Sequence, residues 1–417
     1  MVEEKTAVKA KSASPSTKKN TPRPIDEIGA ETEDRIPSDI SELDGVLGGG
    51  LVAGSVLLLG GEPGIGKSTL LLMAAHHYSK STGIVLYVSA EESESQIALR
   101  AERLGVQSKS LFLVSENSIQ AIMEHIDALQ PKILIIDSIQ TVQSAELESQ
   151  AGTVGQLREC TFALANLSKA RGISTFLVGH VTKEGNIAGP KLLEHMVDVV
   201  LYFESSTSHS LRLLRSMKNR FGSTHEVGVF EMCSEGLRQI TNPSSLFLSE
   251  HNNGSPGSVI TANLEGSRPL LLEVQSLVCT SYLPVPRRTS IGIDPNRVTL
   301  MAAILEKRGG FHLSDQDIYV NLAGGIKVHE TATDLAVAAA MISSIANRPI
   351  DAESVFFGEI GLGGEVRSIP KVDIRLNEAK RLGFKTVYLP AKSVESIQAP
   401  PGLKLVPIKH IQQLNDI

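Results

Sequence analysis

The sequence predicts an α/β domain with a mainly parallel sheet, followed by an α+β domain. Short apolar runs over residues 55–59, 84–89, 132–137 and 173–179 alternate with helix-like segments, which is the pattern of repeated strand–helix units. A glycine-rich motif follows the first run, at the point where such folds bind phosphate. Beyond residue 242, two adjacent runs predict paired strands instead, and two helices follow.

Composition narrows the class of protein. The chain has 417 residues, 40 Lys and Arg against 46 Asp and Glu, and a net charge of −6, which excludes a globally basic nucleic-acid coat protein but not a local basic channel. It has three cysteines and no CxxC pair, so no zinc site is expected within these residues. Neither a membrane span nor a secretory signal is evident, and we expect a cytoplasmic protein that does not bind membranes.

Residues 1–24 are rich in Lys, Ser, Thr and Pro and have too little apolar content to fold alone. They predict a basic flexible tail, either a solvated linker or an arm that binds nucleic acid.

The first apolar run leads into a P-loop of the form GxxxxGK[ST]. Its residues, expected to bind ATP, are Gly61, Glu62, Pro63, Gly64, Ile65, Gly66, Lys67 and Ser68, with Thr69 in the helix that follows. Backbone N–H groups of the loop and the helix N-terminus surround the phosphates. Lys67 reaches the β- and γ-phosphates, and the Ser68 hydroxyl binds Mg²⁺.

Asp137 ends the apolar run that lies about 70 residues after the P-loop, as expected of a second Mg²⁺ ligand. The next residue is Ser138, so the catalytic carboxylate must come from elsewhere. We expect Glu91, which follows the 84–89 strand, to polarise the attacking water, with Glu92 as the reserve; alternatively both only cap the next helix. His180, after the 173–179 strand, is either a γ-phosphate sensor or a structural histidine.

Six motifs occur in one order: GGGL (48–51), the P-loop, AEES (90–93), IDSI (136–139), VGHVTK (178–183) and KNRFG (218–222). Together they resemble the RadA (Sms) family of bacterial DNA-repair proteins, from about residue 25 to the C-terminus. The resemblance implies a RecA-like ATPase domain over 25–242 and a Lon-protease-like domain over 243–417. It also implies a DNA-dependent ATPase and ring-shaped helicase, a homo-hexamer that promotes branch migration and works with a recombinase. Members of this family usually begin with a four-cysteine zinc finger, which these residues do not supply.

The KNRFG motif is predicted to follow a hairpin. Two cations, Lys218 and Arg220, suit phosphate contact, and because the P-loop already has Lys67 we expect them to complete the site of a neighbouring subunit. Phe221 is expected to anchor the loop, and Gly222 to provide a tight turn.

Single-stranded and branched DNA are the expected ligands of the basic residues in the segments around the core. We expect DNA contact from the segments 140–155 and 181–190, led by Lys183, with Lys191, Arg287 and Arg288 as further contacts. Base stacking is not expected to dominate, since only 17 residues are aromatic, 6 Tyr and 11 Phe, and none is Trp.

Two other functions compete with this one. An ATP-dependent Lon-type protease needs a Ser/Lys pair, whereas matching the order of elements places Asp334 and Asp373 at those positions, so we expect that chemistry to be lost. A P-loop regulatory ATPase or small-molecule kinase would not need the second domain.

Overall fold

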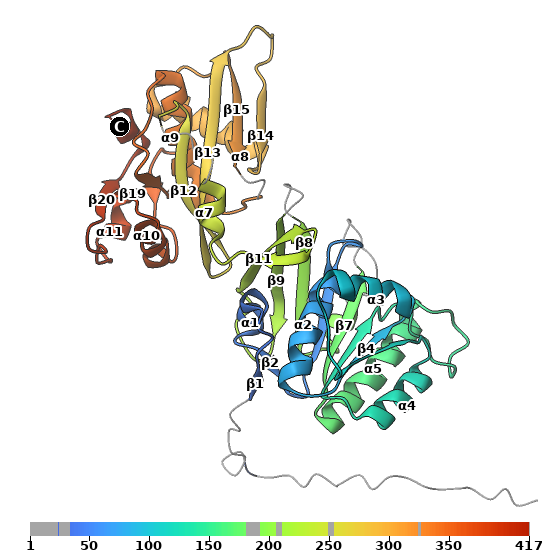
Figure 1. Ribbon diagram of the computed structural model, residues 1–417. Helices are drawn as coiled ribbons and strands as arrows, with labels where there is room; N and C mark the ends of the chain where they lie inside the picture. Colours follow the sequence, from blue (N-terminus) through green and yellow to red (C-terminus); the bar gives the residue numbers. More distant parts are fainter. Residues whose placement is uncertain are drawn as a thin grey trace, which may run out of the picture. The chain divides into compact units, whose positions relative to one another are not determined.

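The computed structural model describes residues 24, 34–180, 192–205, 211–248, 254–323 and 327–416. Two large sheets organise them, one before residue 240 and one after residue 257 (Figure 1). The expected tail over 1–24 lies outside the described residues except for Pro24.

The first sheet has nine strands in the order β11-β10-β9-β8-β3-β7-β6-β4-β5. Six neighbouring strands are parallel: β3 (Val56–Gly61), β4 (Val85–Ser89), β5 (Leu111–Ser115), β6 (Ile133–Asp137), β7 (Ser174–His180) and β8 (Val199–Ser205). Four of them occupy the apolar runs that the sequence identified, and their C-terminal ends meet at one edge of the sheet. The prediction of a mainly parallel α/β sheet is therefore confirmed.

Helices cover both faces of this sheet. On one face, α2 (Lys67–Ser81) and α3 (Glu94–Arg103) pack their apolar side chains against alternate residues of the parallel strands, and α1 (Ser41–Leu47) packs against the antiparallel end of the sheet. On the other face, α4 (Ile119–Leu129) and α5 (Val154–Arg171) pack against the intervening residues. Because strand side chains alternate between faces, fully apolar strands fit this three-layer arrangement.

The sheet continues beyond β8 as an antiparallel ribbon. Its strands are β9 (Leu211–Asn219), β10 (Val227–Cys233) and β11 (Gly236–Gln239). The predicted hairpin around residues 205–211 is the β8–β9 pair. A small separate ribbon joins β1 (Arg35–Ile36) to β2 (Leu51–Val52).

The second sheet is mixed and has the order β14-β15-β13-β12-β16-β19-β20. Its strands are β12 (Ser258–Glu265), β13 (Arg268–Thr280), β14 (Arg288–Ile291), β15 (Gln316–Leu322), β16 (Ser354–Phe356), β19 (Thr386–Pro390) and β20 (Lys404–Ile408), while β17 (Glu359–Ile360) and β18 (Val366–Arg367) form a short hairpin. The paired strands predicted beyond residue 242 are the β12–β13 hairpin.

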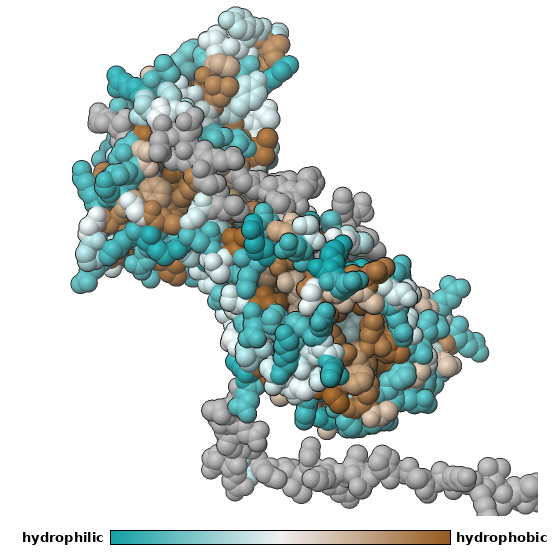
Figure 2. All heavy atoms as spheres, viewed as in Figure 1, coloured by the Kyte–Doolittle hydropathy of each residue, from teal (hydrophilic) through white to brown (hydrophobic). Residues whose placement is uncertain are grey.

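Helices cover this second sheet as well. The two helices predicted after the paired strands are α8 (Pro295–Ile304) and α9 (Asp334–Ala346), which pack on one face, while α10 (Val372–Arg381) packs on the other. Two short helices, α7 (Pro243–Leu248) and α11 (Ala391–Val394), also belong to this part of the chain. Hydrophilic residues are spread over much of the visible surface, with apolar patches between them (Figure 2). The domain boundary at 242–243 stays a prediction, although it falls between the last strand of the first sheet and α7.

Candidate functional site

The P-loop connects β3 to α2, and a glycine precedes the helix. Gly66, the residue before α2, has φ 115°, a left-handed conformation that favours glycine. A Cβ atom at this position would lie 2.7 Å from the Met232 side chain. The backbone conformation explains the glycine before Lys67, since the Met232 side chain could move aside, and this turn presents the helix N-terminus to the site.

Lys67 is buried under the P-loop and points into the site. Its Nζ donates to the carbonyl oxygens of Gly61 at 2.8 Å and Glu62 at 2.9 Å, and lies 3.1 Å from Nδ1 of His180. Burial lowers the pKa of Lys67 to about 8, although the nearby carboxylates of Asp137 and Glu91 oppose this shift. A phosphate that enters here would compete with these acceptors for the Lys67 ammonium group.

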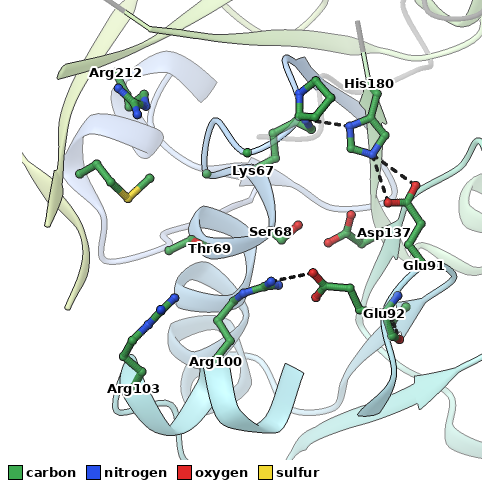
Figure 3. A pocket seen from close by; sticks show the side chains of 15 residues that line it. Lys67, Ser68, Thr69, Glu91, Glu92, Arg100, Arg103, Asp137, His180 and Arg212 are labelled. Atoms are coloured by element: carbon green, nitrogen blue, oxygen red, sulfur yellow. Dashed lines mark hydrogen bonds and ion pairs between the residues drawn. The ribbon is translucent and has the colours of Figure 1, made fainter. Parts of the chain in front are cut away.

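Asp137 ends β6 beside the P-loop helix. Figure 3 shows its carboxylate and the Ser68 hydroxyl directed toward one another. The hydroxyl of Tyr87, which is buried in β4, donates to Oδ2 of Asp137 at 2.6 Å. Burial raises the pKa of Tyr87 well above its ordinary value, and the negative charge of Asp137 acts in the same direction, so the hydroxyl remains the donor.

Glu91 lies two residues after the end of β4, where its carboxylate has two polar partners. Nε2 of His180 lies 3.2 Å and 3.3 Å from its two carboxylate oxygens, and Ser138 Oγ donates to one of them. The hydrogen bond from His180 lowers the pKa of Glu91, against the opposing effect of burial, and the bond from Ser138 also lowers it. Glu91 is therefore an anion at neutral pH.

Glu92 and the start of the next helix have other partners. Arg100 donates to Glu92 at 2.7 Å, and the helix α3 is capped by Ser93, whose backbone and side chain are bound by Gln96. The capping role that the sequence left open for the two carboxylates is thus filled by Ser93.

A cavity of about 470 Å³ is lined by Lys67, Ser68, Glu91, Glu92, Arg100, Asp137 and His180. Its other walls come from Pro63, Gly64, Gly66, Thr69, Ser89, Arg103, Arg212 and Met232. Sequence reasoning missed Tyr87, Arg100, Arg103 and Arg212, because each is a single polar residue outside the six motifs. It noted Ser138 but not its bond to Glu91, which depends on tertiary structure. Arg212 reaches the site from β9 and donates to the carbonyl oxygen of Ile65. The set fits ATP with Mg²⁺: oxygen ligands from Ser68 and Asp137, cations for phosphate, and space for a nucleotide.

The KNRFG residues lie elsewhere. Lys218 lies on β9 beside the start of β8, at the edge formed by the N-terminal ends of the parallel strands. Its Nζ donates to the carbonyl oxygens of Glu194 at 2.7 Å and Val197 at 2.8 Å. Arg220 pairs with Asp198 at 3.0 Å. Phe221 packs against the core, as predicted. Gly222 is outside the left-handed region; a Cβ there would lie 3.1 Å from Asn219 and 3.4 Å from Gly48, so close packing and not a turn explains this glycine.

The basic residues proposed for DNA are only partly visible. Lys183, Lys191 and the segment 181–190 lie outside the described residues. The segment 140–153 is held in place by Gln156, whose side chain bonds the backbone at Ser144, Leu147 and Ser149. In the second sheet, Arg287 is exposed, and Arg288 begins β14 with a weak bond to the Leu313 carbonyl.

The two positions matched to a protease dyad differ from each other. Asp334 is buried at the start of α9, pairs with Arg297 and accepts from the Ile360 N–H at 3.0 Å. Asp373 is exposed in the first turn of α10. Neither is a serine or a lysine, so these two residues cannot form a Ser/Lys dyad.

Known proteins with similar sequences establish the family of this chain. The chain is 47% identical over 392 residues to DNA repair protein RadA of Bacillus subtilis, covering 94% of this chain and 86% of that protein. The chain belongs to the RadA family. The RadA of Halalkalibacterium halodurans is 46% identical over 421 residues, covering 100% of this chain and 92% of that protein. The RadA of Streptococcus pyogenes serotype M6 is 48% identical, covering 95% and 87%.

Two family models match parts of this RadA-family chain. The AAA domain matches residues 21–186, and the ChlI subunit of Mg-chelatase matches 289–393. The resemblance drawn from the motifs is therefore confirmed: a RecA-like P-loop ATPase core is followed by a Lon-like domain. A KaiC-like protein of Pyrococcus horikoshii aligns at 20% identity and a TM-score of 0.43, over 50% of this chain and 99% of that one.

Within the described ranges, no group of three or more His, Cys, Asp or Glu side chains is arranged to hold a metal ion. No helix of the described part of the chain is long and apolar enough to cross a membrane.

Proposed function

We propose that this chain is a DNA-dependent ATPase that processes recombination intermediates in DNA repair, a ring-shaped motor that promotes branch migration on single-stranded DNA. The observation that carries the proposal is the contact of His180 with both Lys67 and Glu91. It joins the phosphate-binding lysine and the candidate base to the end of β7, from which the segment 181–190 departs. The curated relatives carry the name DNA repair protein.

Each residue of the site has a role in the proposed hydrolysis. Lys67 holds the phosphates, and Ser68 and Asp137 would hold Mg²⁺, which supplies charge neutralisation of the phosphates when bound. Glu91, kept anionic by His180 and Ser138, orients the attacking water and accepts its proton. Glu92 is the weaker candidate for the base because its carboxylate is already paired with the Arg100 guanidinium.

Lys218 and Arg220 would act on the nucleotide of a neighbouring subunit. Asn219 pairs with Val199, which pairs with Leu57, four residues before Gly61 at the P-loop end of β3. At about 3.3 Å per residue this separates the motif from its own P-loop by ~13 Å along the sheet. Such a position supports a role between subunits, and hence a homo-hexameric ring, better than a role in the same chain.

DNA would be bound by segments that leave the nucleotide edge of the sheet. The segment 140–155 follows β6, and Gln140 donates to the His180 carbonyl oxygen at 3.3 Å, which links it to β7. We propose Lys183 as the leading contact, with Lys191, Arg287 and Arg288 as further phosphate contacts. The Lon-like domain would serve as a scaffold and a DNA-binding surface without proteolysis. A recombinase partner follows only from the family.

The test compares ATP turnover of the full chain with and without single-stranded DNA, together with casein cleavage. Stimulation by DNA supports the motor, whereas cleavage of casein would favour the Lon-type protease, and turnover indifferent to DNA would favour a regulatory ATPase. Lys183→Ala should weaken DNA binding and flatten its salt dependence by about one unit of slope. An unchanged slope would exclude Lys183 as a phosphate contact.

A further inference from the structure

A buried tyrosine lies directly under the candidate metal site. Tyr87 occupies the middle of β4, only 1% exposed, and β4 runs parallel to β6 with Ser89 paired to Asp137. Tyr87 pairs with Ile135 and packs with it on the α2 face of the sheet, so Asp137, two residues after Ile135, faces the same side. The hydroxyl has one hydrogen-bond partner among the described residues, Oδ2 of Asp137 at 2.6 Å.

Asp137 itself is held by few other groups. Its side chain is 9% exposed, and within the described ranges no second donor reaches its carboxylate. A carboxylate at the end of a strand can rotate, and rotation would move the oxygen that faces Ser68 (Figure 3). Carboxylates that bind metals are commonly held by a hydrogen bond to the oxygen that does not bind the metal.

We propose that Tyr87 is a positioning residue for the metal-binding carboxylate of Asp137. By donating to Oδ2 it fixes the plane of the carboxylate, so that the other oxygen is directed at the position of Mg²⁺ beside Ser68. This inference rests on the proposed nucleotide function, and it adds to it a residue that no motif of the P-loop fold includes.

The core alone does not explain a tyrosine at this position. A buried hydroxyl costs free energy unless it is hydrogen-bonded, and phenylalanine would fill the same apolar space. Tyr78 provides the matched comparison. It is equally buried, on the same face of the sheet and in the same apolar cluster, but it belongs to the C-terminal half of α2, and within the described residues its hydroxyl makes no hydrogen bond to the nucleotide site.

The experiment measures how Mg²⁺ strengthens the binding of a fluorescent ADP analogue to the full chain. Tyr87→Phe should raise the half-saturating Mg²⁺ concentration at least ~10-fold, the usual effect of removing a partner of a metal ligand, and leave the affinity in EDTA within about twofold. Tyr78→Phe should leave both quantities at the wild-type value. 4-Aminophenylalanine at position 87, which retains a donor, should restore part of the Mg²⁺ response.

The possible outcomes separate the inference from the proposed function. Equal Mg²⁺ requirements in Tyr87→Phe and Tyr78→Phe, with a wild-type chain that responds to Mg²⁺, would overturn the inference alone. A wild-type chain that binds the analogue without regard to Mg²⁺, or not at all, would overturn both. If Tyr87→Phe does not fold, Tyr87→Met gives the same comparison, since methionine adapts to irregular core space and has no donor.

Discussion

Nδ1 of His180 lies 3.1 Å from Nζ of Lys67, while Nε2 of the same ring lies 3.2 Å from Glu91. Because the ammonium group can only donate, Nδ1 accepts, and the hydrogen of a neutral imidazole is then on Nε2 and directed at Glu91. A phosphate that binds Lys67 competes with the imidazole for the same hydrogens. His180 is thus placed to respond to an incoming phosphate and to change the environment of Glu91.

Replacing His180 should lower DNA-stimulated ATP turnover much more than it lowers nucleotide affinity. His180→Ala keeps the P-loop and the Mg²⁺ ligands, so we expect the affinity for ADP to stay within about threefold. Glu91 loses its main donor, and the end of β7 loses its link to Lys67, so DNA-stimulated turnover should fall at least ~10-fold. His76→Ala, on α2, is the control. Turnover that remains fully stimulated by DNA in His180→Ala would contradict the sensor role.

Glu91→Gln should bind ATP and hydrolyse it poorly. The amide cannot accept the proton of water, and loss of a general base typically lowers turnover by about 10²–10⁴-fold. Glu92→Gln, which removes the partner of Arg100, is the control and should lose much less. Measured kcat and ADP affinity of the two variants decide between them: near-normal turnover in Glu91→Gln would transfer the role to Glu92 or another group.

The strands that hold this site follow from the sequence because buried parallel strands are continuous apolar runs and because the P-loop has a fixed spacing. The residue contacts between strands do not. Tyr87 reads as one more β-forming residue, and its function depends on the register that pairs Ser89 with Asp137. Arg212 comes from an antiparallel strand 145 positions after Lys67 along the chain, and only the strand order brings it to the P-loop. Local patterns fix elements, whereas these pairings depend on tertiary structure.

Nucleotide affinity should decrease with pH above about 8. Burial lowers the pKa of Lys67 to about 8, so the ammonium form that attracts phosphate is lost as pH rises through this value. ADP affinity measured at pH 7.5 and 9.5 should therefore fall roughly tenfold in the wild type and remain flat in Lys67→Met. The stability of the nucleotide-free protein should change in the opposite direction. An unfolded lysine keeps its proton up to about pH 10.5, so the contribution of Lys67 to folding stability increases as pH rises from about 8 to 10.5. A flat pH profile for the wild type would exclude a titrating Lys67.

The stability of the Lon-like domain should depend on the ion pair between Arg297 and Asp334. Asp334 is buried, and burial raises its pKa although the bond from Arg297 opposes this. Arg297→Met leaves a buried carboxylate without its cation, which we expect to cost about 3 kcal/mol of unfolding free energy in denaturant titrations of the full chain. The double variant Arg297→Met/Asp334→Leu should recover most of the loss. If the single and double variants are equally stable, the pair is not what stabilises the start of α9.

Subunits that lack Lys218 should be rescued by subunits that lack Lys67. Lys218 lies at the opposite edge of the sheet from its own P-loop, so in a ring it would reach the nucleotide held by its neighbour. Lys67→Ala and Lys218→Ala should each be nearly inactive alone, because one loses phosphate binding and the other the cation that stabilises the developing charge. In randomly mixed rings about a quarter of the interfaces join an intact P-loop to an intact Lys218, and DNA-stimulated turnover should return in proportion.

The control mixes Lys67→Ala subunits with Glu91→Gln subunits. Both residues line one cavity of the same chain, so no mixing of these subunits can assemble a complete site. If the first mixture is as inactive as the second, while wild-type rings assembled in the same way hydrolyse ATP, Lys218 does not act between subunits.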